Sequence, residues 1–146
     1  EPNYFKAFQR EMPPHVVQLE ILGVGANTLS LVARAQEIKD DRARGDYPFD
    51  QVWIVFDLDS FEADNFDNAI YKADAAKMRC AWSNEAFELW YILHFDYRDT
   101  GMHRKEYLAK LSDLLGEPYR KNATDMYEKL LLRGNQAQAS MGEEIT

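Results

Sequence analysis

Hydrophobic and polar residues follow two different spacings along the chain, and these spacings predict alternating helices and strands. Hydrophobic residues three and four positions apart indicate amphipathic helices, whereas short runs rich in β-branched and aromatic residues indicate strands. In chain order the pattern predicts a helix over 4–12, a strand over 15–22, a helix from 27 or 28 to 38, a strand over 51–56, a helix over 64–77, a strand over 79–83, and helices over 85–95, 105–115 and 123–132.

The segment 51–56 is the strongest predicted strand, because it is hydrophobic on both faces. Such a run is typical of the middle of a parallel sheet. The helix that follows turns Phe66, Ala69 and Ala73 toward the interior, and a further strand comes after it. Strands that alternate with helices indicate βαβ units. We therefore expect an α/β fold with a mostly parallel sheet flanked by helices, followed by C-terminal helices.

Composition favours one folded domain over residues 1–146. Hydrophobic residues make up 46% of the 146 positions, and neither an internal repeat nor an interior linker is visible. A chain of this length buries enough surface to fold without metal or disulfide cross-links. The single cysteine, Cys80, fits a reducing compartment. No hydrophobic run reaches the roughly 20 residues that span a bilayer, so we expect a cytoplasmic protein without a membrane anchor.

The net charge limits how the protein can meet nucleic acid. With 17 Lys and Arg against 25 Asp and Glu, the formal net charge is −8. A broad basic face that neutralises phosphates is therefore excluded. Any contact with nucleic acid must be local or bridged by a metal ion.

Asp57 and Asp59 are the sharpest chemical signal, because they leave the most hydrophobic strand together. Residues two apart in an extended chain point to the same side, about 6 to 7 Å apart at Cα. Two carboxylates at that spacing can share one hard cation, which also offsets their mutual repulsion. The alternative is a structural one, in which Asp57 caps the loop and Asp59 begins a turn.

Glu88 is the second candidate, because it is the one acidic residue in the hydrophobic stretch 86–95. A buried carboxylate needs a partner. Asn84 lies one turn earlier on the predicted helix, and both side chains would then face the cleft that holds the two aspartates. The alternative is a structural glutamate bonded to backbone or to an arginine.

The remaining candidates carry weaker signals. Ser83 and Asn84 follow a predicted strand, and in open α/β sheets ligands bind beyond the carboxyl ends of strands. His94 lies six residues after Glu88 and is either catalytic or a histidine of the core. Tyr119 and Lys121 lie in a loop and are either phosphate contacts or solvated loop residues.

The motif at residues 57–59, the run Ser-Asn-Glu-Ala-Phe-Glu-Leu-Trp at 83–90 and the pair His94-Phe95 together resemble the RloB family, which includes the AbiLii abortive-infection proteins. The opening Glu-Pro-Asn-Tyr-Phe is similar to the segment after that family's first strand, so the first strand is expected upstream of this chain. Members are bacterial, are encoded in restriction-modification or abortive-infection loci, and usually neighbour an ATPase subunit (RloA-like).

The resemblance implies a Toprim-like fold and metal-dependent phosphodiester chemistry with Mg²⁺ or Mn²⁺. Asp57 and Asp59 match the family's Asp-x-Asp metal motif, and Glu88 would complete the metal shell or act as a general base. The glutamate of the first Toprim strand has no match, because Glu1 resembles a later glutamate of the family. Glu85-Ala86 also departs from the Pro-Cys that relatives often have.

Three functions follow from these patterns. The first is a metal-dependent nuclease of antiphage defence. The second is a non-catalytic regulatory or scaffolding partner of the neighbouring ATPase, which a shortage of basic residues favours. The third is a haloacid-dehalogenase-like phosphatase with Asp57 as nucleophile, although Phe61 stands where that chemistry usually has Thr or Val.

Overall fold

The structure, a computed structural model, describes residues 1–15, 19–23, 28–58, 63–97 and 101–133. The chain forms two compact units. Unit 1 combines Glu1–Gly23 with Glu88–Thr146, and unit 2 is the continuous segment Val24–Phe87.

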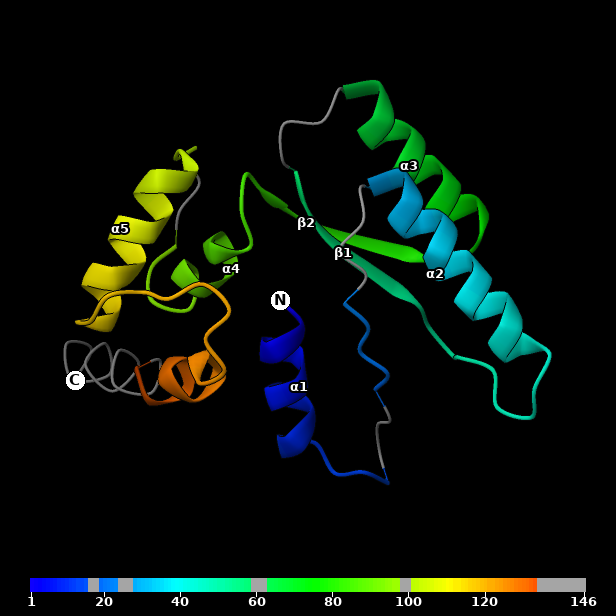
Figure 1. Cartoon of the computed structure of the whole chain (residues 1–146), viewed down its shortest axis with the longest axis horizontal. Helices are drawn as coiled ribbons and strands as arrows, with labels where there is room; N and C mark the ends of the chain where they lie inside the picture. Colours follow the sequence, from blue (N-terminus) through cyan, green and yellow to red (C-terminus); the bar gives the residue numbers. More distant parts are fainter. Residues whose placement is uncertain (16–18, 24–27, 59–62, 98–100, 134–146) are drawn as a thin grey trace, which may run out of the picture. The chain divides into compact units, whose positions relative to one another are not determined.

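The helices and strands follow the predicted order in most places (Figure 1). Unit 2 contains α2 (Thr28–Ala43), β1 (Trp53–Leu58), α3 (Ala63–Ala75) and β2 (Arg79–Asn84). Unit 1 contains α1 (Pro2–Glu11), α4 (Glu88–Ile92), α5 (Arg104–Leu115) and a helical segment over 126–133.

The described residues build a sheet of two parallel strands, β1 and β2, joined through α3. Ile54 is paired with Cys80, and Asp57 is paired with Ser83. This arrangement is a βαβ unit, as the alternation of strands and helices predicted. The structure therefore confirms a small parallel sheet with helices packed on it, and the Toprim-like fold stays a prediction.

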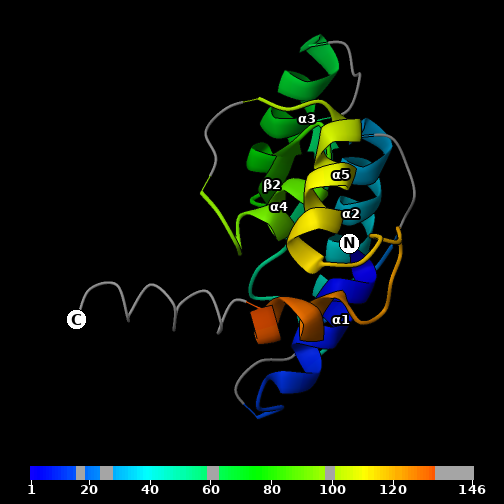
Figure 2. The ribbon, with the colours of Figure 1, turned by 90° about the vertical axis from the view of Figure 1, so that its left-hand side faces the viewer.

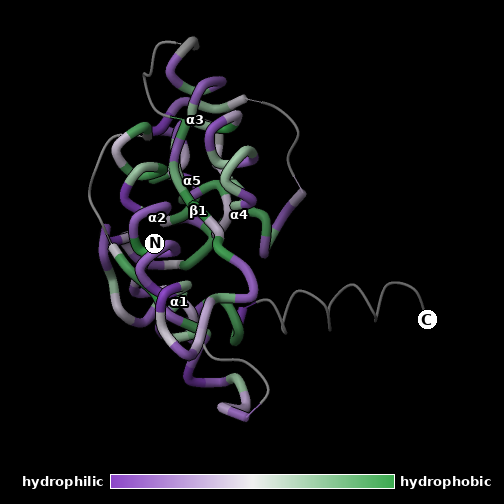
Figure 3. The backbone as a smooth tube through the Cα atoms, turned by 90° about the vertical axis from the view of Figure 1, so that its right-hand side faces the viewer, coloured by the Kyte–Doolittle hydropathy of each residue, from purple (hydrophilic) through white to green (hydrophobic). Residues whose placement is uncertain are grey.

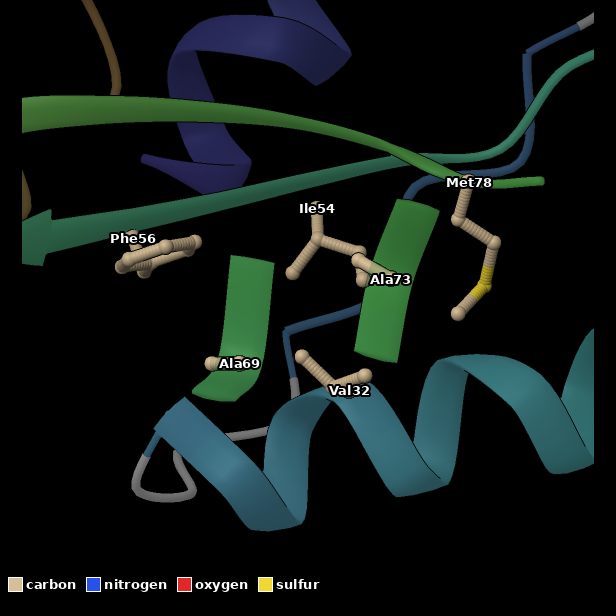
Figure 4. Close-up of a cluster of buried hydrophobic side chains, with 6 residues drawn as sticks. All are labelled: Val32, Ile54, Phe56, Ala69, Ala73 and Met78. Atoms are coloured by element: carbon tan, nitrogen blue, oxygen red, sulfur yellow. The ribbon is translucent and has the colours of Figure 1, made fainter. Parts of the chain in front are cut away.

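The core of unit 2 lies between the sheet and the two helices α2 and α3. Ile54 and Phe56 alternate with outward-facing residues of β1 and point toward the helices (Figure 4). Along the chain, the hydrophobic strand β1 follows a hydrophilic segment (Figure 3). The buried side chains of β1 contact Ala69 and Ala73 of α3, and these small residues let the helix approach the strands closely. The buried cluster comprises Val32, Ile54, Phe56, Ala69, Ala73 and Met78.

The end of α3 is closed by a Schellman motif. The Lys77 N–H donates to the Asp74 oxygen at 2.8 Å, and the Met78 N–H donates to the Ala73 oxygen at 2.8 Å. Lys77 has φ +55°, the left-handed conformation that this motif requires. Met78 then turns into the core, so the motif joins the helix end to the first residue of β2.

In unit 1, α1 lies beside the segment 126–133 (Figure 2). The rings of Tyr4 and Tyr127 are 5.7 Å apart between centroids, and Phe8 lies 5.8 Å from the same tyrosine ring. Asn3 adds a hydrogen bond of 3.1 Å from Nδ2 to the Asn122 oxygen. Edge-to-face aromatic contacts of this kind stabilise beyond their buried area.

The helix α5 packs beside α4, and both of its ends are capped. At its start the His103 N–H donates to Glu106 Oε2 at 2.8 Å. At its end Gly116 adopts φ +69°, and Arg133 Nη2 donates to the Leu115 oxygen at 2.6 Å. The side chains of Tyr107, Leu111 and Leu115 are buried.

Two predicted elements differ from the structure. The predicted strand over 15–22 has no regular secondary structure at 19–22, and residues 16–18 lie outside the described part. One reason is visible at Leu19, whose backbone oxygen accepts a hydrogen bond of 2.7 Å from Gln9 Nε2 on α1. The β-branched composition of this segment therefore does not lead to a ladder there.

The predicted helix over 85–95 is also wrong at both of its ends. β2 continues through Asn84, Glu85 has φ +60°, and α4 begins only at Glu88 and ends at Ile92. A left-handed residue interrupts the backbone, so Asn84 does not share a helix face with Glu88. Trp90 is also 45% exposed, so this helix is not buried all round.

Candidate functional site

The carboxyl end of the sheet places Asp57 beside Ser83, because the two residues are register partners in β1 and β2. Ile54 and Phe56 face the helices, so the alternation of a strand directs Asp57 to the other face of the sheet. On β2, Trp82 packs against Phe66 of α3, so Ser83 lies on the same face of the sheet as Asp57. The Oδ1 atom of Asp57 is buried. A shielded carboxylate and a hydroxyl therefore lie on neighbouring strands at the same level.

The Asp57 carboxylate and the Ser83 hydroxyl supply oxygen donors of the kind that hard divalent cations bind. Carboxylate and hydroxyl oxygens suit Mg²⁺, which usually takes one or two carboxylates and completes its shell with waters and substrate phosphates. The described residues contain no group of three His, Cys, Asp or Glu side chains suited to hold a metal. Asp59 and Phe61 lie outside the described residues, as does the side chain of Asn84. The pairing of Asp57 with Asp59 thus stays a prediction.

Glu88 is a buried carboxylate, with 7% of its surface exposed, at the first position of α4. Its partner is Tyr119, whose Oη donates to Glu88 Oε1 at 3.0 Å. This partner is neither the backbone nor the arginine that a structural glutamate was expected to have. Tyr119 lies 31 positions later, after a helix and a proline, and no local pattern in the sequence signals the contact.

Burial and the nearby negative charge act together on the tyrosines around Glu88. Burial raises the pKa of Tyr119, and the Glu88 carboxylate raises it further. The pKa of Tyr91 is raised by the same two causes. The rings of these two tyrosines lie 6.3 Å apart between centroids. Both phenols therefore keep their protons at neutral pH, and Tyr119 donates its hydrogen bond to the carboxylate.

His94 is engaged through both nitrogens of its ring. Nδ1 lies 2.8 Å from the Trp90 oxygen, and Nε2 lies 3.4 Å from Tyr4 Oη. A carbonyl oxygen only accepts, so Nδ1 carries a proton that it donates to the Trp90 oxygen. This arrangement anchors α4 to α1, and the catalytic role predicted for His94 stays a prediction.

The other predicted residues fall into the two units. Asp57 and Ser83 belong to unit 2 and lie together, and Glu88 and Tyr119 belong to unit 1 and are hydrogen-bonded. Lys121 is exposed in a turn of unit 1, and its predicted contact with phosphate stays a prediction. No helix of the described part combines the length and the hydrophobicity needed to cross a membrane.

Comparison with known proteins identifies the family to which the chain belongs. Neither the curated proteins nor the solved structures contain a significant match. The family model described as RloB-like protein matches residues 1–141, nearly the full chain. This match agrees with the resemblance carried by the motifs at 57–59 and 83–90. The chain therefore belongs to the RloB-like protein family.

Proposed function

We propose that this chain is the Toprim-like catalytic domain of an antiphage defence protein that cleaves phosphodiester bonds with the help of Mg²⁺ or Mn²⁺. The observation that carries this proposal is the position of Asp57 at the carboxyl end of β1, level with Ser83 of β2. Ligands of open α/β sheets bind at that end of the strands. Membership of the RloB-like family is consistent with a role in defence.

In this proposal the residues of the chain have separate tasks. Asp57 and Asp59 hold the cation, whose chemistry is to polarise the scissile phosphate and offset the developing negative charge. Ser83 and Asn84 bind the substrate at the strand ends. A net charge of −8 is compatible with this task, since the metal ion rather than a basic face meets the phosphate.

Three residues of unit 1 also have a part in the proposal, namely Glu88, His94 and Lys121. Glu88 is assigned to general base chemistry, for which a buried carboxylate is suited. His94 is assigned an auxiliary catalytic role, and Lys121 a contact with phosphate. The assignments of Glu88 and His94 rest on the family motif, and that of Lys121 rests on its charge and its position in a turn.

The test replaces Asp57 and Asp59 by Asn in the full-length protein. We expect loss of Mn²⁺-dependent cleavage of DNA and RNA substrates, loss of phage resistance, and loss of the heat stabilisation that Mn²⁺ gives to the wild type. Asp67→Asn, an exposed aspartate on α3, is the matched control and should retain all three. Unchanged cleavage in the double variant would reject the proposal.

The acidic charge of the chain favours one alternative, a regulatory partner of a neighbouring ATPase. In that case the carboxylates are structural, and the protein acts by binding the ATPase. Co-purification with the ATPase, together with phage resistance that survives in the double variant, would support this alternative. Mn²⁺ would then give no heat stabilisation to the wild type.

A further inference from the structure

A hydrogen-bonded chain in unit 1 runs from the body of α5 to the Glu88 carboxylate. Ser112 Oγ donates to the Leu108 oxygen at 2.9 Å, and the Tyr119 N–H donates to Ser112 Oγ at 3.0 Å. Tyr119 Oη then donates to Glu88 Oε1 at 3.0 Å. Ser112 on α5 therefore fixes the backbone of Tyr119, and the side chain of Tyr119 in turn fixes the Glu88 carboxylate.

From this geometry we propose that Tyr119 is a positioning residue that fixes the Glu88 carboxylate for catalysis. The inference rests on the proposed function, in which Glu88 acts in phosphodiester chemistry. It replaces the substrate-binding role that the sequence predicted for Tyr119. A phenol whose oxygen is already directed at a buried carboxylate, and whose ring is half-buried, is poorly placed to meet a phosphate.

The surroundings of Tyr119 restrict how its ring can move. The ring packs against Tyr91 at 6.3 Å between centroids, and the backbone of Tyr119 is tied to Ser112. Because the ring and the backbone are both held, the hydroxyl approaches Glu88 from one direction.

A fixed carboxylate has two oxygens with different tasks. Oε1 accepts the hydrogen bond from Tyr119 Oη, so Oε2 is the oxygen that we assign to the attacking water. Removing the hydroxyl releases a carboxylate that must then rotate into place for each reaction. A misplacement of this kind lowers kcat rather than the affinity for substrate, and losses near 100-fold accompany shifts of about 1 Å.

The experiment compares Tyr119→Phe with Glu88→Gln, and with both changes together, in the full-length protein. We expect Tyr119→Phe to lower kcat of Mn²⁺-dependent cleavage by roughly 10- to 100-fold with KM unchanged. In the Glu88→Gln background the same change should cost no further activity, because the group that it positions is already gone. Tyr97→Phe removes the hydroxyl of a tyrosine that is 82% exposed and should leave kcat unchanged.

Ser112→Ala tests the chain one step further away. This change removes the acceptor of the Tyr119 N–H without touching Glu88, so we expect a smaller fall in kcat. All rates are taken per folded molecule, with the folded fraction measured by circular dichroism. A purely structural role would lower the folded fraction and leave the corrected kcat at the wild-type value.

Other results would overturn the inference in distinguishable ways. If Tyr119→Phe keeps the wild-type kcat while the Asp57 and Asp59 double variant is inactive, the positioning role is wrong and the proposed function stands. If Tyr119→Phe raises KM with kcat unchanged, Tyr119 binds substrate as the sequence predicted. If the wild-type protein shows no metal-dependent cleavage, the proposed function and this inference fail together.

Discussion

The Nζ atom of Lys39 on α2 donates hydrogen bonds to the backbone oxygens of Ala76 and Lys77, at the point where α3 ends. These oxygens belong to the negative end of the helix dipole, where a cation is favourable. One side chain therefore closes a helix end and ties the two helices of unit 2 together.

Replacing Lys39 by Met keeps most of the hydrocarbon stem and removes the donor. We expect the free energy of unfolding to fall by about 1 to 2 kcal/mol, since a charged hydrogen bond to the end of a helix is lost. Chemical denaturation followed by circular dichroism measures the change. Lys6→Met, at an exposed position in the middle of α1, is the control and should change stability little. Equal stability of the two variants would contradict the assigned role.

The core of unit 2 depends on Ile54, whose side chain is 3% exposed between the sheet and the two helices. Ile54→Ala leaves a cavity as well as removing buried surface, so we expect a loss of about 2 to 5 kcal/mol. Ile54→Val should cost about 1 kcal/mol. Leu132→Ala, at a residue that is 70% exposed, serves as a control in the same denaturation experiment. A core substitution as mild as this control would show that the cluster is packed differently.

Gly116 occupies the left-handed region at the end of α5, with φ +69°. A Cβ atom there would lie 3.5 Å from Arg133 Nη2, an ordinary contact, so any cost comes from the backbone. Gly116→Ala should lower stability by about 1 to 2 kcal/mol. Gly116→Asn should cost less, because Asn tolerates this conformation. Gly101→Ala, with open space around its Cβ, should be neutral in thermal unfolding.

Because the pKa values of Tyr91 and Tyr119 are raised in the folded state, we expect the free energy of unfolding to fall at alkaline pH. The folded-state pKa of Tyr119 is raised above the ordinary value near 10, so its contribution is complete below pH 10. Above pH 10 the unfolded chain releases this proton while the folded chain keeps it, and stability falls as the pH rises. One such proton contributes a slope of up to about 1.4 kcal/mol per pH unit.

Tyr119→Phe removes the phenol, so the folded and unfolded states no longer differ in protonation at this position. The free energy of unfolding, measured between pH 9 and 11.5, should therefore fall less steeply in the variant than in the wild type. Tyr97→Phe removes an exposed phenol and should keep the wild-type slope. Parallel curves for wild type and Tyr119→Phe would mean that Tyr119 titrates normally in the folded protein.

The elements with regular hydrophobic spacing could be predicted from the sequence. The helix expected over 64–77 corresponds to α3, which spans Ala63–Ala75, and the strand expected over 79–83 corresponds to β2. Ala69 and Ala73 are buried as expected, and Phe66 is partly buried against the same core. In these elements local preference and tertiary burial favour the same structure, so the pattern was sufficient.

The errors arise where a single backbone or side-chain event decides the structure. The hydrophobic stretch after β2 contains nothing that marks Glu85 as left-handed, so the spacing predicts a start of α4 that is too early. Near Leu19 a hydrogen bond from Gln9 occupies a backbone oxygen that the predicted strand would have used in pairing. Neither event leaves a periodic signature in the sequence.

The sequence predicts which residues belong to the candidate site, but only some of the contacts between them. Asp57 and Ser83 were expected at neighbouring strand ends, and the register places them there. The contact between Tyr119 and Glu88 was not expected, since it joins residues that local spacing does not relate. A buried charge requires a partner, but that requirement does not identify which distant residue supplies it.

The division of unit 1 into two stretches of sequence bears on how the protein is made. Helix α1 leaves the ribosome before three of its contact residues, His94, Asn122 and Tyr127, have been synthesised. The continuous segment Val24–Phe87 can collapse in the meantime, because its partners are already present. The aromatic face of α1 therefore reaches its partner ring at Tyr127 only after most of the chain has been synthesised.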